Sequence, residues 1–372
     1  MEFNKELIYK IIDNKIDKIL LVGLNEQELN ILYHALNLNY SLKELYLNDN
    51  KIKDITLLCK SLKNNSCLEK LGLYKNKIED ITSLKFLKNN SCLQVLSLYN
   101  NKIKDITPLK FLSNSCLQYL DLSWNKIKDI TPLKFLSNSC LKELRLTYNQ
   151  IEDLTPLKFL YNSCLINLYL SDNKIKDITP LKFLSNSCLQ ELTLSYNQIK
   201  DLTPLKFLFN SCLKNLDLSN NKIKDITPLS YLENNSCLET LNLYNNQIRD
   251  ITPLRVLENN SCLKNLSLSS NQIEDINPLR FLENNSCLKK LDLSINPIRD
   301  ITPLRFLENN SYLQELYLNC NKIEDISSLK FLENNSCLRI LDLSYNLIKC
   351  QYQSEQKIRD IKVKLKQINL II

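Results

Sequence analysis

Side chains capable of chemistry are few in kind along this 372-residue chain, and most of them recur at regular intervals. His34 is the only histidine, so nucleophilic catalysis of the Ser-His or Cys-His type has a single candidate base. Aspartates and cysteines are numerous, but they stand at one fixed position in many equivalent segments. A catalytic group is needed once, whereas a group that recurs in every segment is expected to support the framework. The sequence therefore predicts no enzymatic activity.

Eleven of the fourteen cysteines stand directly before the first leucine of a segment. They could be disulfide partners, metal ligands or small reduced thiols. In-register parallel strands lie about 4.8 Å apart with side chains pointing the same way, whereas a disulfide needs converging Cβ atoms near 3.8 Å, and such a row does not give tetrahedral zinc ligation. We therefore interpret the row as reduced, partly buried thiols and expect no metal and no cofactor. The row comprises Cys67, Cys92, Cys116, Cys140, Cys164, Cys188, Cys212, Cys237, Cys262, Cys287 and Cys337.

Aspartates form a second row, which runs from Asp54 to Asp325. Each stands two residues before a possible helix start, as Asp129 precedes Thr131-Pro132. The aspartate carboxylate can accept backbone N–H bonds in this turn. The Thr-Pro pair is typical of a helix start, with the hydroxyl as N-cap and proline at the first helical position. The aspartate row is thus predicted to be structural.

One repeated stretch positions all of these groups. Its clearest copy, residues 117–140, reads LQYLDLSWNKIKDITPLKFLSNSC, and thirteen copies follow one another at intervals of 24 to 26 residues. A period of this length is typical of a solenoid, in which each copy contacts only its neighbours. The copies begin at Leu42, Leu68, Leu93, Leu117, Leu141, Leu165, Leu189, Leu213, Leu238, Leu263, Leu288, Leu313 and Leu338.

Each copy predicts a strand, a turn and a short helix. Leu120 and Leu122 alternate on one face of the strand. Asn125 has a counterpart in every copy, and stacked copies would place these amides in a ladder that satisfies backbone groups of the turn. The Asn-Ser pair at the end, Asn138-Ser139 in this copy, leads the chain into the next strand.

The motif L-x-x-L-x-L-x-x-N-x-I over roughly residues 42–349 is that of the leucine-rich repeat family. The D-I-T-P-L continuation, Asp129 to Leu133, resembles internalins and phosphatase-regulatory repeats, and the Asn-Ser pair resembles longer, ribonuclease-inhibitor-type repeats. The wealth of Asn, Lys and Ile resembles proteins of AT-rich genomes such as amoeba-infecting giant viruses. The resemblance implies a right-handed α/β solenoid with a curved parallel sheet on its concave side and short helices or 3-10 turns on its convex side. It also implies a non-catalytic protein–protein interaction module, such as a scaffold, that binds its partner through the concave face.

The ends of the chain depart from the repeat. Residues 1–41 are predicted to form an N-terminal helix (1–15) and a degenerate capping repeat (16–41), whose Asn25 and Glu28 can form a capping box. Residues 42–349 hold the thirteen repeats, and residues 350–372 are expected to form a C-terminal cap. Ser354 can begin a final helix there, while the alternation over residues 361–365 also permits a strand.

Membrane and export signals are not evident. No apolar run approaches the roughly 20 residues that span a bilayer. The N-terminus carries charges every few residues and so does not resemble a secretory signal peptide. We expect a cytoplasmic protein without membrane association, which for a viral protein means the host cell cytoplasm.

Binding information should lie at the third, fifth, seventh and eighth positions of each copy, which vary and should face outward. These positions carry ten acids and four bases, although the net charge of the whole chain is +7. They also carry Tyr, Trp and Arg, the types enriched at binding hot spots. An alternative is that Tyr is simply common here, with 17 in the chain, and is tolerated on strands. The candidate partner-binding residues are Tyr99, Tyr119, Trp124, Arg145, Tyr148, Tyr169 and Tyr196.

Acidic residues are expected to border this candidate surface. Asp121, Glu143 and Asp172 stand at outward positions of the same copies and should form its rim. No structural requirement is evident for the varied residues at the fifth position of each copy. These observations suggest a partner that offers apolar anchors flanked by Lys or Arg.

Basic residues on the turns offer a second candidate surface, for nucleic acid or another anionic surface. Lys102, Lys104 and Lys128 are examples. Acidic residues interleave with these lysines, as in Lys-Ile-Lys-Asp, so a solvated polar flank is the simpler interpretation. We therefore expect a protein partner of unknown identity, no small-molecule substrate and no nucleic acid. Steep salt dependence would distinguish nucleic-acid binding.

Overall fold

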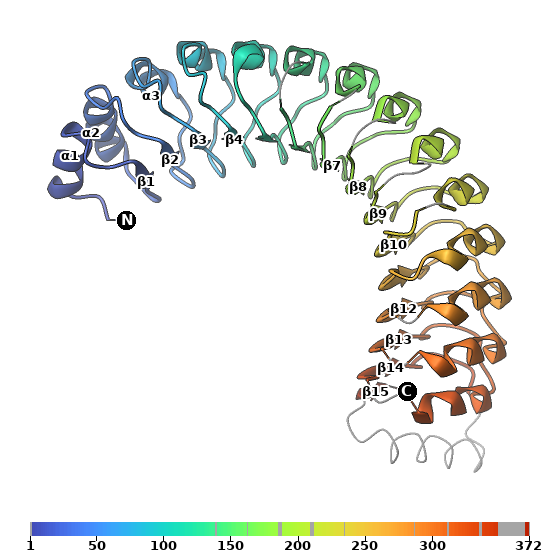
Figure 1. Ribbon diagram of the computed structural model, residues 1–372. Helices are drawn as coiled ribbons and strands as arrows, with labels where there is room; N and C mark the ends of the chain where they lie inside the picture. Colours follow the sequence, from blue (N-terminus) through green and yellow to red (C-terminus); the bar gives the residue numbers. More distant parts are fainter. Residues whose placement is uncertain are drawn as a thin grey trace. The chain divides into compact units, whose positions relative to one another are not determined.

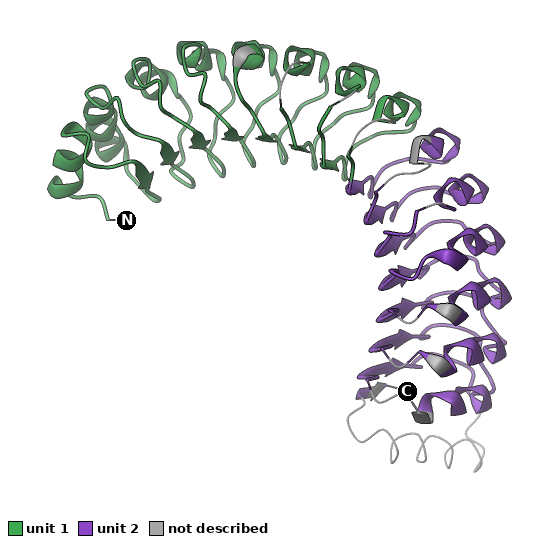
Figure 2. Ribbon diagram, in the orientation of Figure 1, with its two compact units in different colours: residues 1–189 green, residues 190–372 purple. Residues whose placement is uncertain are grey.

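The computed structural model describes residues 2–137, 140–161, 163–184, 188–208, 212–233, 235–285, 287–310, 312–334, 337–348 and 369–371. The chain forms two compact units, residues 1–189 and residues 190–372 (Figure 2). Both units are built from the same short repeat, so each has strands on one side and short helices on the other (Figure 1).

The strands are three residues long, and each pairs in parallel with the next strand of its unit. Equivalent positions of successive repeats lie opposite one another, so that Leu120 of β5 is paired with Leu144 of β6. The first unit holds β1 (Lys18–Leu20), β2 (Glu44–Tyr46), β3 (Lys70–Gly72), β4 (Val95–Ser97), β5 (Tyr119–Asp121), β6 (Glu143–Arg145) and β7 (Asn167–Tyr169). The second holds β8 (Glu191–Thr193), β9 (Asn215–Asp217), β10 (Thr240–Asn242), β11 (Asn265–Ser267), β12 (Lys290–Asp292), β13 (Glu315–Tyr317), β14 (Ile340–Asp342) and β15 (Asn369–Ile371).

Short helices form the opposite layer. Among the described residues, three are α-helical: α1 (Lys5–Ile12), α2 (Glu26–Leu36) and α3 (Thr56–Ser61). The others are 3-10 helices: η1 (Thr82–Leu87), η2 (Thr107–Asn114), η3 (Thr131–Leu136), η4 (Thr155–Leu160) and η5 (Thr179–Leu184) in the first unit, and η6 (Thr203–Leu208), η7 (Thr227–Leu232), η8 (Thr252–Asn259), η9 (Asn277–Asn284), η10 (Thr302–Asn309) and η11 (Ser327–Asn334) in the second. In the first unit the strands lie on the inner side of the curve and the helices on the outer side (Figure 1). The predicted α/β solenoid is confirmed.

The core lies between the two layers and follows the repeat. Leu117, Leu120 and Leu122 are fully buried from the strand side, and Leu133 and Leu136 close the core from the helix side. Removing such apolar side chains from water contributes roughly 1.5–3 kcal/mol each. Because neighbouring copies bury the same positions, the core is continuous within each unit.

The asparagine ladder is present as predicted. The Asn125 amide nitrogen donates to the carbonyl oxygens of Leu98 and Leu122, each at 3.0 Å, and its side-chain oxygen accepts from the Ile103 N–H at 3.0 Å. Each amide therefore links its own turn to the preceding repeat. This explains why a buried polar residue recurs in every copy.

The predicted helix start is wrong in one detail. Thr131 is the first residue of η3 and not its N-cap, because Ile130 occupies the N-cap position and no side-chain hydrogen bond caps it. Instead, the Thr131 N–H donates to Asp129 Oδ1 at 2.8 Å. The structural role of the aspartate row is thus confirmed, and the carboxylate takes the place that we had assigned to the hydroxyl.

In the N-terminal region, α1 is shorter than the helix predicted over residues 1–15. Asn4 caps α1, and β1 and α2 form the degenerate repeat. Asn25 and Glu28 make both hydrogen bonds of the capping box, at 3.0 and 2.9 Å. At the other end, β15 pairs with β14, while the helix or strand predicted within residues 354–368 lies outside the described residues.

Most thiols of the cysteine row are exposed, so the expectation of partial burial was wrong for Cys67 through Cys237. Cys262, Cys287 and Cys337 are half-buried, and no disulfide joins the cysteines of the described residues. The position lies outside the L-x-x-L-x-L core, which explains its exposure. In the described part of the chain, no group of three or more His, Cys, Asp or Glu side chains could hold a metal ion. No helix there is long and apolar enough to span a bilayer.

Candidate functional site

Four aromatic side chains form a continuous row along consecutive repeats of the first unit, which we call the aromatic ladder: Tyr74, Tyr99, Trp124 and Tyr148. The ring centroids of Tyr74 and Tyr99 lie 6.3 Å apart, and those of Tyr99 and Trp124 lie 6.4 Å apart, both edge to face. Trp124 and Tyr148 stack at 4.0 Å with an interplanar angle of 26°. The exposed fractions of Tyr74, Trp124 and Tyr148 are 37%, 44% and 42%. The ladder is therefore a connected aromatic surface that solvent reaches.

Trp124 and Tyr148 occupy a backbone conformation that large side chains avoid. Both have φ of 55°, in the left-handed region. The eighth residue of all thirteen repeats, from Asp49 to Tyr345, has φ between 52° and 57°, so the turn itself imposes this geometry. Glycine and asparagine tolerate it best, and other residues lose roughly 1–2 kcal/mol. Every residue at this position shares that backbone geometry, so what distinguishes Trp124 and Tyr148 is the exposed aromatic surface that they place there.

Arg145, the last residue of β6, is the centre of a second group, which we call the arginine cluster. Its guanidinium carbon lies 5.6 Å from the Tyr119 ring centroid and 4.6 Å from that of Tyr169. Its Nε donates to Glu143 Oε1, and Glu143 also accepts from Asn167 Nδ2 at 3.2 Å. The guanidinium is held in one orientation by two aromatic rings and a carboxylate.

We had expected Asp121 to form an exposed rim of the binding surface, but it does not. It is buried, and its Oδ1 accepts from the Ser123 N–H at 2.9 Å. The hydroxyl of Tyr119 donates to Asp121 Oδ2 at 3.3 Å. Burial, and then the negative charge of Asp121, raises the pKa of Tyr119 to about 12, so Tyr119 remains a neutral donor at physiological pH.

The acids of the strand face are mostly used within the protein. Glu44 pairs with Lys18 and Lys70 at 3.0 and 2.8 Å. In the second unit Glu315 pairs with Lys290 at 3.0 Å. Asp217, Asp292 and Asp342 each accept the backbone N–H two residues on, as Asp121 does. Most of these carboxylates are therefore engaged within the protein, Glu44, Glu143 and Glu315 by cations and the aspartates by neutral N–H groups.

Asp172 differs from these acids. It is the eighth residue of the repeat after that of Tyr148, with φ of 54°. Burial raises its pKa above the usual value, and no cation or hydrogen-bond donor among the described residues contacts its carboxylate. The Asn149 N–H donates to the Asp172 carbonyl at 3.1 Å, so the turns of Tyr148 and Asp172 lie side by side.

The predicted site residues divide between these groups. Tyr99, Trp124 and Tyr148 belong to the ladder, and Tyr119, Arg145 and Tyr169 belong to the arginine cluster. Tyr196 is part of the second unit, where it is 54% exposed with φ of 52°. The prediction missed Tyr74, although it holds the same seventh position as Tyr99.

Gly72 contradicts the expectation that the fifth position of each repeat has no structural requirement. A Cβ at Gly72 would lie 2.5 Å from Tyr46 Cδ1. The Tyr46 ring therefore packs directly over the Gly72 backbone, and this repeat needs glycine there.

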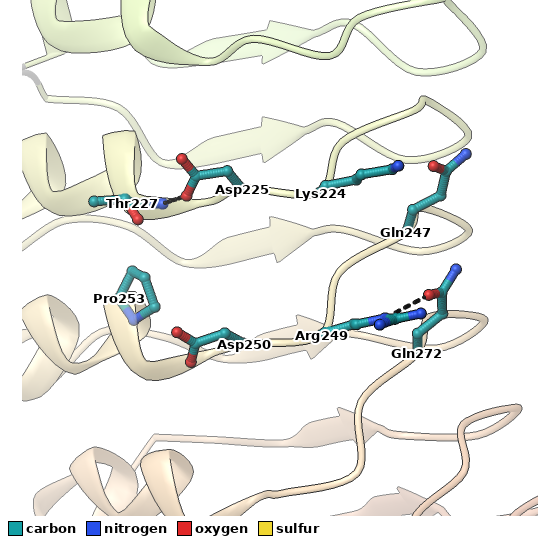
Figure 3. Close-up of a pocket in the computed structure, with 8 residues that line it drawn as sticks. All are labelled: Lys224, Asp225, Thr227, Gln247, Arg249, Asp250, Pro253 and Gln272. Carbon is teal, nitrogen blue, oxygen red and sulfur yellow. Dashed lines mark hydrogen bonds between the residues drawn. The ribbon is translucent and has the colours of Figure 1, made fainter.

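The basic turns form a polar flank of the repeats, on which acids accompany the bases in the sequence. In the second unit, an open cavity of about 590 Å³ lies on this flank (Figure 3). Arg249 Nε donates to Gln272 Oε1 at 2.9 Å, and Asp225 accepts the Thr227 N–H at 2.8 Å. In Figure 3, Asp225 and Asp250 lie toward the helices and Lys224 and Arg249 lie toward the glutamines, so both acids and bases line the cavity.

Comparisons with known proteins agree with the repeat architecture. The family model described as leucine-rich repeats in two copies matches residues 68–111, 93–135, 117–159, 213–256 and 263–306. Two further models described as leucine-rich repeat match residues 139–199 and 309–326. The chain belongs to the leucine-rich repeat family. Among curated proteins, no sequence matches it.

Solved structures share the fold over nearly the whole chain. An internalin, InlF of Listeria monocytogenes, is 31% identical, with 91% of this chain and 88% of that chain covered and a TM-score of 0.72. A leucine-rich repeat protein of Leptospira interrogans is 22% identical, with coverage of 100% and 99% and a TM-score of 0.75. The ectodomain of the Arabidopsis thaliana receptor kinase GASSHO1/SCHENGEN3, solved in complex with CASPARIAN STRIP INTEGRITY FACTOR 2, is 21% identical, with coverage of 93% and 46% and a TM-score of 0.61.

Proposed function

We propose that this protein is a non-catalytic module that binds a protein or peptide along the strand face of its first unit. The observation that carries the proposal is the aromatic ladder, a connected and exposed row of rings, two of which stand at strained backbone positions. Aromatic rings on a rigid sheet also bind with little loss of side-chain entropy.

The arginine cluster supports the same surface. Arg145 is already oriented by Glu143, Tyr119 and Tyr169, so a ligand would not have to order it. Preorganisation of this kind reduces the entropy cost of binding. Leucine-rich repeat structures such as the receptor kinase ectodomain have been solved with a ligand bound, and the absence of an evident catalytic group in the sequence agrees with a binding role. His34 is exposed on α2, and we assign it no function.

We further propose that the protein acts in the cytoplasm. The support is the row of exposed free thiols, since a reducing compartment keeps such thiols from oxidising.

The test is capture of partners from a cell lysate by the full chain, followed by titration of the captured partner. Trp124→Ala should weaken binding by roughly 2 kcal/mol or more, the range of a hot spot. Tyr244→Ala, which removes an exposed aromatic side chain from the second unit, and Lys134→Ala on the helix side are the matched controls and should change binding little. If Lys134→Ala weakens binding in a strongly salt-dependent manner while Trp124→Ala does not, the ligand uses the basic surface and the proposal is wrong.

A further inference from the structure

The distribution of unpaired charge on the first unit identifies what the ligand must carry. Glu44 is occupied by two lysines, Glu143 by Arg145 and Asp121 by the Ser123 N–H and the Tyr119 hydroxyl. Of the acids on this face, Asp49 and Asp172 are left without a cation or donor among the described residues. They share the eighth repeat position and the left-handed conformation, with φ of 54° in each.

Only Asp172 adjoins the aromatic ladder. Its turn lies beside that of Tyr148, since the Tyr148 N–H donates to the Ser171 carbonyl at 3.0 Å and the Asn149 N–H donates to the Asp172 carbonyl at 3.1 Å. Asp49 lies instead between Gly23 and Lys75, the residues at the same position of the flanking repeats. A carboxylate next to an aromatic ring is the usual environment of a bound ammonium or guanidinium group.

We propose that Tyr148 and Asp172 form a subsite for a cationic side chain, arginine or lysine, of the peptide that lies along the aromatic ladder. This inference rests on the proposed function and adds the chemistry of the ligand. The partly buried carboxylate loses hydration without gaining a partner in the free protein, so an arriving cation meets an acceptor whose desolvation is already partly complete. The Tyr148 ring, held against Trp124 at 4.0 Å, offers a face or edge at a fixed place.

The chain carries its own reporter for this subsite. Trp124 is the only tryptophan, so its single indole N–H resonance reports directly on the end of the ladder that contacts Tyr148. The probes are N-acetyl-arginine methylamide and N-acetyl-citrulline methylamide, which have nearly the same shape and differ in charge. Each is titrated into the full chain while the indole resonance is followed.

The arginine probe should shift the resonance with half-saturation at millimolar concentration. The citrulline probe should need a concentration at least about five-fold higher for half-saturation, because it lacks one ion pair and one cation–π contact. Asp172→Asn should remove this difference, and asparagine is well tolerated at positive φ, so the fold is retained. Asp49→Asn is the matched control and should preserve the difference. Equal half-saturation for both probes, or an unchanged difference in Asp172→Asn, overturns the cationic subsite. The proposed function has a separate test, since loss of partner binding in Trp124→Ala does not depend on either probe.

Discussion

Trp124 and Tyr148 stack with their ring centroids 4.0 Å apart, although each residue has a left-handed backbone conformation. The stack is worth about 0.5–1.5 kcal/mol, and the conformational cost of each residue is of similar size. Stability alone therefore gives little reason to keep this pair. The pair is better explained by what it presents to a ligand.

A substitution at Tyr148 can separate these two contributions. Tyr148→Asn loses the stack but places a well-tolerated residue at positive φ, so the free energy of unfolding should change by less than about 1 kcal/mol. The indole of Trp124 should become more exposed, and its fluorescence emission should move to longer wavelength. Urea unfolding and emission spectra of the same samples measure both effects. An unfolding free energy lowered by several kcal/mol would show that the stack is mainly structural.

The same backbone position predicts a stabilising change in the second unit. Ile295 is β-branched, 47% exposed and has φ of 53°. Ile295→Asn should raise the free energy of unfolding by about 1 kcal/mol, because asparagine relieves the backbone strain and little buried apolar surface is lost. Thermal unfolding of the variant measures this. Asn245→Ile is the reverse control at the same repeat position and should destabilise by a similar amount.

The asparagine ladder should be sensitive to truncation. Asn125→Ala leaves the carbonyls of Leu98 and Leu122 and the N–H of Ile103 without their side-chain partner. Each buried unpaired group costs about 1–3 kcal/mol, so urea unfolding should show a loss of at least that size. Asn125→Asp keeps the acceptor but loses both donors, and it should also destabilise. If Asn125→Ala leaves the free energy of unfolding unchanged, water replaces the amide and the prediction is wrong.

The aspartate row predicts a loss of stability in acid. The Thr131 hydroxyl and then the Thr131 N–H lower the pKa of Asp129, and the corresponding threonines lower the pKa of Asp80, Asp177, Asp225 and Asp250. A lowered pKa in the folded state stabilises the protein above the unfolded value of about 3.9, and this contribution is lost as the pH falls through the folded pKa. The urea concentration at the unfolding midpoint should therefore decrease when the pH is lowered below about 4. Thr131→Val should raise the pKa of Asp129 in an NMR titration.

The thiol row predicts a redox result. Alkylation of the denatured protein from cells, followed by mass spectrometry, should find all fourteen cysteines free. Free thiols would agree with a reducing compartment. Native disulfides between neighbours of the row would contradict both this interpretation and the proposed cytoplasmic location.

The fold was predictable because one rule is applied many times. The spacing of Leu117, Leu120 and Leu122 fixes a strand and its buried face, and thirteen copies make the pattern unambiguous. Single side chains were harder to place. Sequence spacing could not show that Asp121 turns inward to the Ser123 N–H, or that the Asp129 carboxylate replaces the Thr131 hydroxyl.

The binding surface was only partly predictable for the same reason. Residue types alone grouped Tyr119, Trp124, Arg145 and Tyr148, but they did not separate the ladder from the arginine cluster. The ladder comes from the seventh and eighth positions, in the turn after each strand, whereas the arginine cluster comes from the third and fifth positions, within the strands. Residue identity does not reveal this turn, because Trp, Lys, Ser and Cys all adopt it.

The constancy of that turn has a consequence for how the surface can change with time. Thirteen residues of varied chemistry share one backbone geometry, so a point mutation at this position rewrites the exposed surface without moving its neighbours. Insertion or deletion of one whole repeat would preserve the same contacts between neighbours. Such an event would lengthen, shorten or divide the row of rings in steps of one strand. New ligands could then be acquired by changing the order of existing copies, with the core left intact.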